Sequence, residues 1–315
     1  MRIVFCGTPE FAVPPLRRLL AEPGISVEAV ITQPDRPRGR GQQVSSSPIK
    51  EAALQAGLHV CQPETIKSES VQEFLRTLNP DAVVIIAYGQ IIPARLLQIP
   101  RLGWINLHAS LLPRYRGAAP IQWAIANGET LTGLTTMQID AGMDSGPTLL
   151  QAEVEIGPHE TAPELAERLS GIGAELMTKT LRQLERGEIA PQPQDQAAAT
   201  YAPMLKKEHG RINWPLPAQQ IYDRMRGFAP WPGAYTTFRG QTCQLWGAPT
   251  AHTATLGQLA PGEIIVSPAQ IIAACGEGTF LRLDLVQLEG RKRVSGEEFA
   301  RGAHLRSGDQ FSSEL

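Results

Sequence analysis

The sequence has few cysteines and no long hydrophobic run. Four cysteines occur among 315 residues and none belongs to a CxxC pair, which argues against a zinc site and against a disulfide framework. We therefore expect a reduced, cytoplasmic compartment and no metal. No apolar run approaches the length of a membrane span, and no signal-peptide core follows Met1, so we expect no membrane partner.

Two fingerprints of enzyme families are also missing. The first apolar run, residues 2–6, ends at a single glycine, Gly7, rather than at GxGxxG. A dinucleotide site needs the further glycines, so a nucleotide-dependent oxidoreductase is disfavoured. Ser110 lacks the GxSxG surroundings of an activated serine, and no cysteine lies beside it. A covalent nucleophile is therefore disfavoured as well.

Charge is nearly balanced, with a formal net charge of -2. This value alone is unpromising for a nucleic-acid-binding protein, but three local basic clusters stand out. Arg36, Arg38 and Arg40 lie in residues 33–43, which are rich in glycine and proline. We predict a mobile loop there, which either follows a phosphate backbone or is a solvated surface loop. The other two clusters are Lys206-Lys207 and residues 291–293.

Short apolar runs alternate with helical patterns through the first 190 residues. Residues 82–87 are apolar on both faces and rich in β-branched side chains, as expected for a central parallel strand covered by helices on each side. We predict an α/β fold over residues 1–189, with a Rossmann-like, mostly parallel open sheet and helices on both faces. The expected strands are residues 2–6, 25–32, 59–61, 82–87, 104–108, 131–137 and 149–154.

The sequence changes character after residue 189. Residues 190–199 are rich in proline, glutamine and alanine and lack apolar periodicity, and we predict an interdomain linker over residues 190–208. Beyond it, short β-like runs are separated by glycine and proline, which indicates an OB-like β-barrel domain over residues 209–315. The expected strands of this domain are residues 235–238, 243–246, 262–266, 271–274 and 280–287.

Polar side chains lie at the end of the expected strand at residues 104–108. Asn106 and His108 alternate with apolar residues, so both side chains point to the same face of the strand. Tyr88 and Gly89 follow the preceding expected strand. Because ligands of open parallel sheets bind at the carboxyl ends of the strands, we expect these four residues to border one pocket.

A second polar loop, residues 140–146, carries Asp140 and Asp144. A calcium site fits it poorly, because alternating oxygen ligands and a closing glutamate are missing. Asn106, His108 and Asp144 together offer an amide, an imidazole and a carboxylate, which can stabilise an oxyanion and move protons, as acyl transfer to an amine requires. Taken singly, His108 is equally compatible with a buried structural histidine, and Asp144 with a turn residue.

Three motifs carry a resemblance to a known family: Asn-Leu-His at 106–108, Ser-Leu-Leu-Pro-Arg-Tyr-Arg-Gly at 110–117 and Asp-Ala-Gly-Met-Asp-Ser-Gly at 140–146. Together they resemble the 10-formyltetrahydrofolate-dependent formyltransferases. Further segments resemble the members that act on methionyl-tRNA, and the similarity then extends over nearly the whole chain. These segments are residues 33–43, 117–123, 206–208, 211–214 and 228–233. Glycinamide ribonucleotide formyltransferase shares the Asn, His and Asp but would lack the second domain.

The resemblance implies a transferase that moves the formyl group of a co-substrate, 10-formyltetrahydrofolate, to the free α-amino group of initiator methionyl-tRNA through a tetrahedral intermediate. The product, N-formylmethionyl-tRNA, serves translation initiation. Asp144 would orient and help to charge His108 and would accept a proton. His108 would donate to the oxyanion or to the departing folate nitrogen, and Asn106 would hydrogen-bond the formyl oxygen. Which residue moves each proton stays open.

The resemblance also implies two binding sites. The residues implied for folate are Ser110, Leu111, Leu112, Pro113, Tyr88, Gly89, Gln90 and Ile91. Residues 88–91 would line the pterin side of the folate site with backbone groups. The residues implied for tRNA are Arg36, Arg38, Arg40, Lys206 and Lys207, with further phosphate contacts from the barrel. By the same likeness Leu112-Pro113 is expected to be a cis peptide. For Arg114 and Arg116 two roles stay open, which are support of the loop and contact with RNA.

Other functions remain as alternatives. A formyltetrahydrofolate hydrolase or a nucleotide-sugar formyltransferase would keep Asn106, His108 and Asp144 but use another acceptor. A catalytically silent RNA-binding module would use the barrel and the basic clusters alone, and the complete set of three polar residues speaks against it. We expect the protein to act as a monomer.

Overall fold

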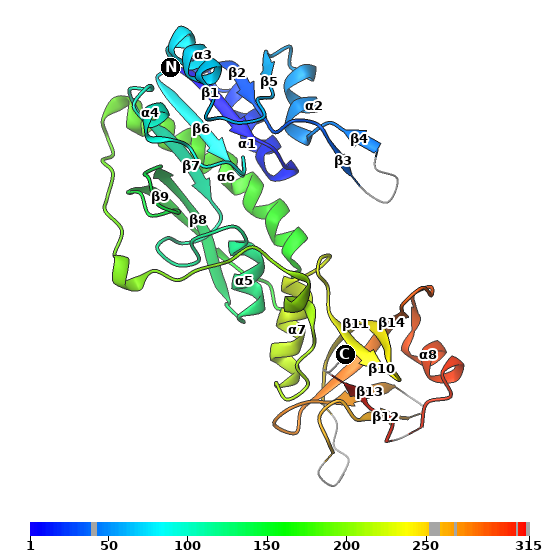
Figure 1. The fold of residues 1–315 in the computed structure, drawn as a ribbon. Coiled ribbons are helices and arrows are strands. Elements are labelled where there is room, and N and C mark those ends of the chain that lie inside the picture. Colours follow the sequence, from blue (N-terminus) through cyan, green and yellow to red (C-terminus); the bar gives the residue numbers. More distant parts are fainter. Residues whose placement is uncertain (39–42, 252–258, 268–269, 307, 313–315) are drawn as a thin grey trace. The chain divides into compact units, whose positions relative to one another are not determined.

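The structure is a computed structural model, and it describes residues 1–38, 43–251, 259–267, 270–306 and 308–312 (Figure 1). It divides into two compact units, which are described here one at a time. The first comprises residues 1–120, 131–155 and 164–203, and the second comprises residues 121–130, 156–163 and 204–315. Each unit is therefore made of several segments that alternate along the sequence.

The first unit is built on a seven-stranded sheet in the order β5-β2-β1-β6-β7-β8-β9. The first five strands in this order pair in parallel, and β8 pairs antiparallel with both β7 and β9. The predicted mostly parallel sheet is therefore confirmed. Every residue of β6 is buried, as expected for its central place. The bounds are β1 Arg2–Gly7, β2 Ser26–Ile31, β5 Val60–Cys61, β6 Ala82–Ile86, β7 Trp104–His108, β8 Leu131–Gln138 and β9 Thr148–Glu155.

Helices cover both faces of this sheet, which β7 illustrates. Trp104 packs in a cluster with Val71 and Leu96 of the helices on one face. Leu107 points to the opposite face, where a Cβ added to Gly173 would come within 2.6 Å of its Cδ2. The helices of this unit are η1 Glu10–Ala12, α1 Val13–Leu20, α2 Pro48–Gln55, α3 Glu69–Leu78, α4 Ala94–Leu97, α6 Ala162–Arg186 and η2 Gln196–Ala198.

Part of the basic segment at residues 33–43 differs from the predicted loop, while residues 39–42 lie outside the described residues. Strands β3 (Arg36–Arg38) and β4 (Gln43–Ser45) pair in an antiparallel ribbon, so an irregular loop is wrong for these residues. The ribbon is anchored at its base by Asp35, whose carboxylate accepts from Lys50 Nζ and, at 2.8 Å, from Gln62 Nε2. These partners lie outside the segment, which is why its own composition did not indicate an ordered base.

The second unit contains an antiparallel sheet in the order β12-β13-β14-β11-β10-β16, with β15 on β14. Its two ends meet, because Ile264 N donates to Asp309 O at 2.7 Å and Phe311 N donates to Gly262 O at 2.9 Å. The sheet therefore curls into a barrel of the predicted OB-like kind. The strands are β10 Tyr235–Phe238, β11 Gln241–Thr250, β12 Ile264–Val266, β13 Ile271–Ala274, β14 Phe280–Leu288, β15 Val294–Ser295 and β16 Phe311–Ser312.

Aliphatic and aromatic side chains together form the core of the second unit. The rings of Trp214 and Phe311 stack at 5.4 Å, and Trp214 Nε1 donates to Thr236 Oγ1 at 3.0 Å. β15 and β16 were not predicted, since each is only two residues long. The helices of this unit are α5 Pro120–Ala126, η3 Lys207–Gly210, α7 Ala218–Gly227 and α8 Gly296–Gly302. Among the described residues, no helix is long and apolar enough to cross a membrane.

Residues 190–203 lie within the expected linker, yet they pack on the first unit. Thr148 N and Gln192 O are joined at 2.8 Å, Arg116 N donates to Thr200 O at 2.8 Å, and Ala202 N donates to Arg116 O at 2.7 Å. Backbone groups make these contacts, and every residue type carries them, so the side-chain pattern did not reveal them. The domain boundaries at residues 189 and 208 stay a prediction.

Candidate active site

The carboxyl ends of β6 and β7 form the edge that was expected to border a pocket. Ile85 pairs with Asn106 in the parallel register, so the residues that follow β6, Tyr88 among them, reach the same edge as His108. Asn106 is partly exposed on β7, and His108 is 6% exposed. All of these residues belong to the first unit.

His108 and Asp144 face each other at this edge. His108 Nδ1 lies 3.7 Å from Asp144 Oδ2. The other ring nitrogen, Nε2, donates to Tyr115 O at 2.9 Å, because a carbonyl oxygen can only accept. Asp144 Oδ2 accepts from Gly117 N at 2.9 Å. Each member of the pair is thus held by the backbone of the same short segment, residues 115–117.

The loop at residues 110–113 is tied to β8 and β9 by two side chains that the sequence did not single out. Thr135 Oγ1 donates to Ser110 O at 2.7 Å and accepts from Leu112 N at 3.0 Å. Gln151 Nε2 donates to Leu112 O at 2.8 Å and to Thr135 Oγ1 at 3.0 Å. The Leu112–Pro113 peptide is cis, as the family likeness led us to expect.

Ser110 and Leu111 have defined surroundings within that loop. Ser110 Oγ donates to Arg114 O at 2.6 Å and is buried, so its hydroxyl closes the loop on itself. Leu111 packs over β8, where a Cβ added to Gly133 would lie 2.5 Å from Leu111 Cδ2. Gly133 therefore gives Leu111 the room to lie flat on the strand.

Residues 88–91 form the second expected wall. Tyr88 O accepts from Gln33 Nε2 at 3.0 Å and from Thr8 Oγ1 at 3.4 Å, and burial raises the pKa of the Tyr88 hydroxyl. Gln90 Oε1 accepts from Ile66 N at 2.7 Å. Ile91 is 77% exposed. The side chain of Ile91 thus offers apolar surface near the carboxyl end of β6.

Arg116 and Gln194 complete the surroundings of Asp144. The Arg116 side chain is buried, and its Nη2 and Nε donate to Gln194 Oε1 at 2.7 and 3.1 Å. Gln194 Nε2 donates to Asp144 O at 2.9 Å and to Gly146 O at 2.7 Å. Arg116 therefore supports the loop at residues 140–146 through Gln194. Gln194 was missed because it lies in the proline- and glutamine-rich stretch, which has no periodicity to single it out.

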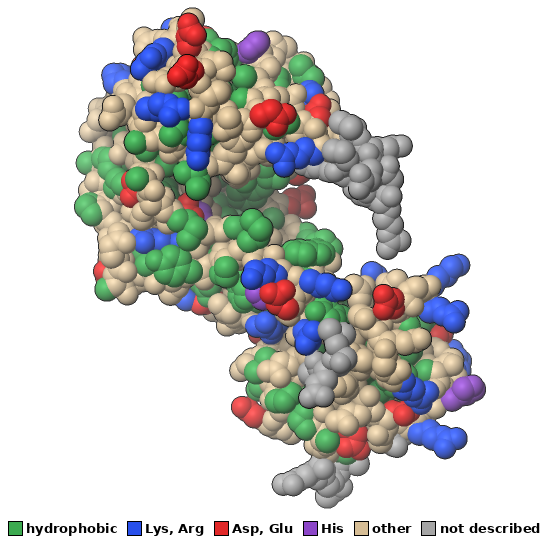
Figure 2. Space-filling model, viewed as in Figure 1, with side chains coloured by type: hydrophobic (Ala, Val, Ile, Leu, Met, Phe, Trp, Pro, Cys, Tyr) green, Lys and Arg blue, Asp and Glu red, His purple; other side chains and the backbone are tan. Residues whose placement is uncertain are grey.

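The five basic residues expected to contact tRNA belong to both units. Arg36 is exposed on β3, Arg38 ends that strand, and Arg40 lies outside the described residues. In the second unit, Lys206 precedes η3 and pairs with Glu208 at 3.7 Å. Lys207 is exposed, with no ion pair among the residues described. Figure 2 shows further Lys and Arg side chains on the visible face of this unit, with Asp and Glu side chains among them.

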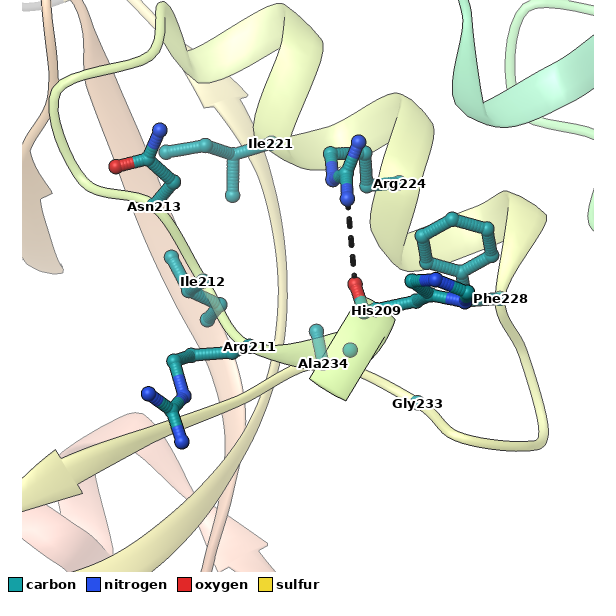
Figure 3. A pocket seen from close by; sticks show the side chains of 10 residues that line it. His209, Arg211, Ile212, Asn213, Ile221, Arg224, Phe228, Gly233 and Ala234 are labelled. Carbon is teal, nitrogen blue, oxygen red and sulfur yellow. Dashed lines mark hydrogen bonds between the residues drawn. The ribbon is translucent and has the colours of Figure 1, made fainter. Parts of the chain in front are cut away.

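The second unit contains a pocket, whose lining side chains are drawn in Figure 3. Within it, Arg224 Nη2 donates to His209 O at 3.4 Å, and the guanidinium lies 5.2 Å from the Phe228 ring centroid. Burial lowers the pKa of Arg224. The lining residues are His209, Gly210, Arg211, Ile212, Asn213, Ile221, Arg224, Phe228, Gly233 and Ala234. Within the described part of the chain, no cluster of His, Cys, Asp and Glu is arranged to hold a metal ion.

Comparison with known proteins places both halves of the sequence. Residues 1–181 match the formyl transferase family, and residues 204–304 match the formyl transferase C-terminal domain. The chain is 51% identical over 311 residues to the methionyl-tRNA formyltransferase of Solibacter usitatus, covering 99% of this chain and 98% of the relative. It is 51% identical over 306 residues to the one of Acidobacterium capsulatum, covering 97% of each.

Solved structures share the fold at lower identity. An N-formyltransferase from Helicobacter canadensis, in complex with folinic acid and dTDP-3-aminofucose, superposes with a TM-score of 0.65 at 17% identity, covering 89% of this chain and 98% of that one. A glycinamide ribonucleotide transformylase from Symbiobacterium toebii gives a TM-score of 0.52 at 22% identity, covering 62% of this chain and 94% of that one.

Proposed function

The chain belongs to the formyl transferase family, and from that premise we propose that it transfers the formyl group of 10-formyltetrahydrofolate to the α-amino group of initiator methionyl-tRNA. The observation that carries the proposal is the 51% identity to a methionyl-tRNA formyltransferase over 99% of this chain. The likeness spans both units of the chain. The product would be N-formylmethionyl-tRNA for translation initiation.

The residues at the strand edge supply the groups that this reaction needs. The α-nitrogen forms a bond to the formyl carbon, the bond from that carbon to the folate nitrogen breaks, and a proton passes from the amine to that nitrogen. Asp144 accepts the amine proton. His108, whose Nδ1 lies 3.7 Å from Asp144 Oδ2, is placed to return a proton to the leaving nitrogen. The Asn106 amide donates to the formyl oxygen as it becomes an oxyanion.

The loops beside this edge suit a folate co-substrate, whose role is to supply an activated formyl group. The exposed side chains of Ile91 and Met143, 77% and 58% accessible, offer apolar surface to a flat ring. Residues 110–113 are fixed to β8 and β9 through Thr135 and Gln151, which gives them a defined backbone to present. Residues 88–91 would contribute backbone groups on the pterin side.

The basic residues would position the tRNA rather than take part in the chemistry. Arg36 on the ribbon of the first unit and Lys207 on the second are exposed, and such side chains bind phosphates without reading sequence. Arg38, Arg40 and Lys206 would add to this contact. We also propose that the protein acts as a monomer in the cytoplasm, where its two substrates meet.

The test is to mix the purified protein with 10-formyltetrahydrofolate and methionyl-tRNA and to detect formylmethionine after hydrolysis of the ester. Parallel reactions offer glycinamide ribonucleotide or a dTDP-linked amino sugar as acceptor. Formylation of methionyl-tRNA alone, abolished by His108→Ala, supports the proposal. Formylation of a small acceptor in preference to methionyl-tRNA, or full activity of His108→Ala, would refute it.

A further inference from the structure

The residues that hold Asp144 against His108 form a connected set. Tyr115 O accepts from His108, and Gly117 N donates to the Asp144 carboxylate. Arg116 lies between them in the chain, and its backbone is fixed on both sides by residues 200 and 202. A displacement of Arg116 would therefore move the supports of both catalytic side chains at once.

Gln194 extends this support to the backbone of the Asp144 loop. Its amide orientation is settled by its partners, because the Arg116 guanidinium can only donate and the two carbonyls can only accept. Oε1 thus faces Arg116 and Nε2 faces Asp144 O and Gly146 O. Gln194 is 9% exposed and Arg116 is 3% exposed, so water does not readily substitute for these bonds.

The loop at residues 140–146 contains a residue with an unfavourable backbone conformation. Asp144 has a φ of 50°, in the left-handed region that costs a non-glycine residue about 1 kcal/mol or more. The neighbouring Met143 is 58% exposed and so adds little packing. The two bonds from Gln194 hold the carbonyls on either side of Ser145 and thereby fix the direction of the Asp144 side chain.

We propose that Arg116 and Gln194 are a positioning pair, which sets the geometry of Asp144 relative to His108 without touching the substrates. The proposal rests on the function proposed above. It also explains why residue 194 is a glutamine. A glutamate there would pair well with Arg116, but it could not donate to the two carbonyls.

The test compares Gln194→Glu and Gln194→Met with a matched control, Gln192→Glu. Gln192 is exposed in the same segment, and its side chain donates to Ala190 O. We expect kcat for formylation of methionyl-tRNA to fall about 10- to 100-fold in both Gln194 variants, because misplacing a catalytic group by an ångström costs that much. KM for each substrate should stay within about threefold of the wild-type value, since no binding contact is lost. Gln192→Glu should match the wild type.

A double-mutant cycle distinguishes positioning from general loss of structure. In an Asp144→Asn background, measured in single turnovers with enzyme in excess, Gln194→Glu should change the rate by less than about twofold, because residues that act as a unit are not additive. Hydrogen exchange in peptides spanning residues 140–147 should be faster in Gln194→Glu than in Gln192→Glu. This readout needs no activity, so it remains informative if the wild type fails to formylate methionyl-tRNA and the proposed function falls.

Three results would overturn the positioning role. They are a wild-type kcat in Gln194→Glu, an additive loss in the Asp144→Asn background, and unchanged exchange over residues 140–147. A rise in KM alone would also contradict it, because that result would mean that Gln194 contributes to binding.

Discussion

Thr135 offers a sharp test of how the proposed folate loop is held. Its buried hydroxyl contacts three partners, Ser110 O, Leu112 N and Gln151 Nε2. Thr135→Val keeps the shape of the side chain but removes all three hydrogen bonds. A buried donor or acceptor that loses its partner costs about 1–3 kcal/mol. The loop can relax part of this cost by moving, and a moved loop would bind the formyl donor less well.

We expect Thr135→Val to raise KM for 10-formyltetrahydrofolate by about tenfold to a hundredfold, since about 1.4 kcal/mol corresponds to a factor of ten. KM for methionyl-tRNA should change little. The assay is steady-state formylation with each substrate varied while the other is saturating, together with a thermal melt of each variant.

The neighbouring residue gives the control. Thr136 is also fully buried, on the opposite face of β8, where its hydroxyl meets Thr180 Oγ1 at 2.8 Å and Leu150 N at 3.1 Å. Thr136→Val should lower the melting temperature by a similar amount and leave both KM values unchanged. If the two variants raised KM for the formyl donor equally, the reasoning that assigns residues 110–113 to folate would be refuted.

Three further predictions concern the catalytic edge and the basic ribbon. Asn106→Leu should lower kcat about 10²- to 10³-fold, because it removes one donor to the oxyanion; a wild-type kcat in steady-state assays would contradict that role. Arg36→Ala and Lys207→Ala should each raise KM for methionyl-tRNA and flatten the plot of log(kcat/KM) against log salt by about one unit of slope. An unchanged slope would argue against phosphate contact. Lys50→Met should destabilise the base of the ribbon, because the hydrogen bond from Lys50 holds the pKa of Asp35 below its ordinary value of 3.8. That stabilisation is present above pH 3.8 and is lost as the pH falls through the lowered pKa, so the difference in melting temperature from the wild type should shrink in acid and stay constant at neutral pH.

Local patterns in the sequence were sufficient to predict most of the strands and to locate the motifs. The strands at residues 82–87 and 271–274 follow from short apolar runs. These signals lie within a few residues of each other. The edge that carries Asn106 and His108 also followed, because alternation along a strand fixes which side chains share a face.

The supports of that edge were decided only by the tertiary structure. Gln194 meets Arg116 across 78 residues and Asp144 across 50, and the ribbon base joins Asp35 to Gln62 across 27. Such contacts leave no periodic trace in the chain, since they depend on how distant segments are brought together. Many of them also involve backbone carbonyl and amide groups, which every residue carries. The sequence by itself determined which side chains the edge at the carboxyl ends of β6 and β7 presents, and the fold decided what holds them in place.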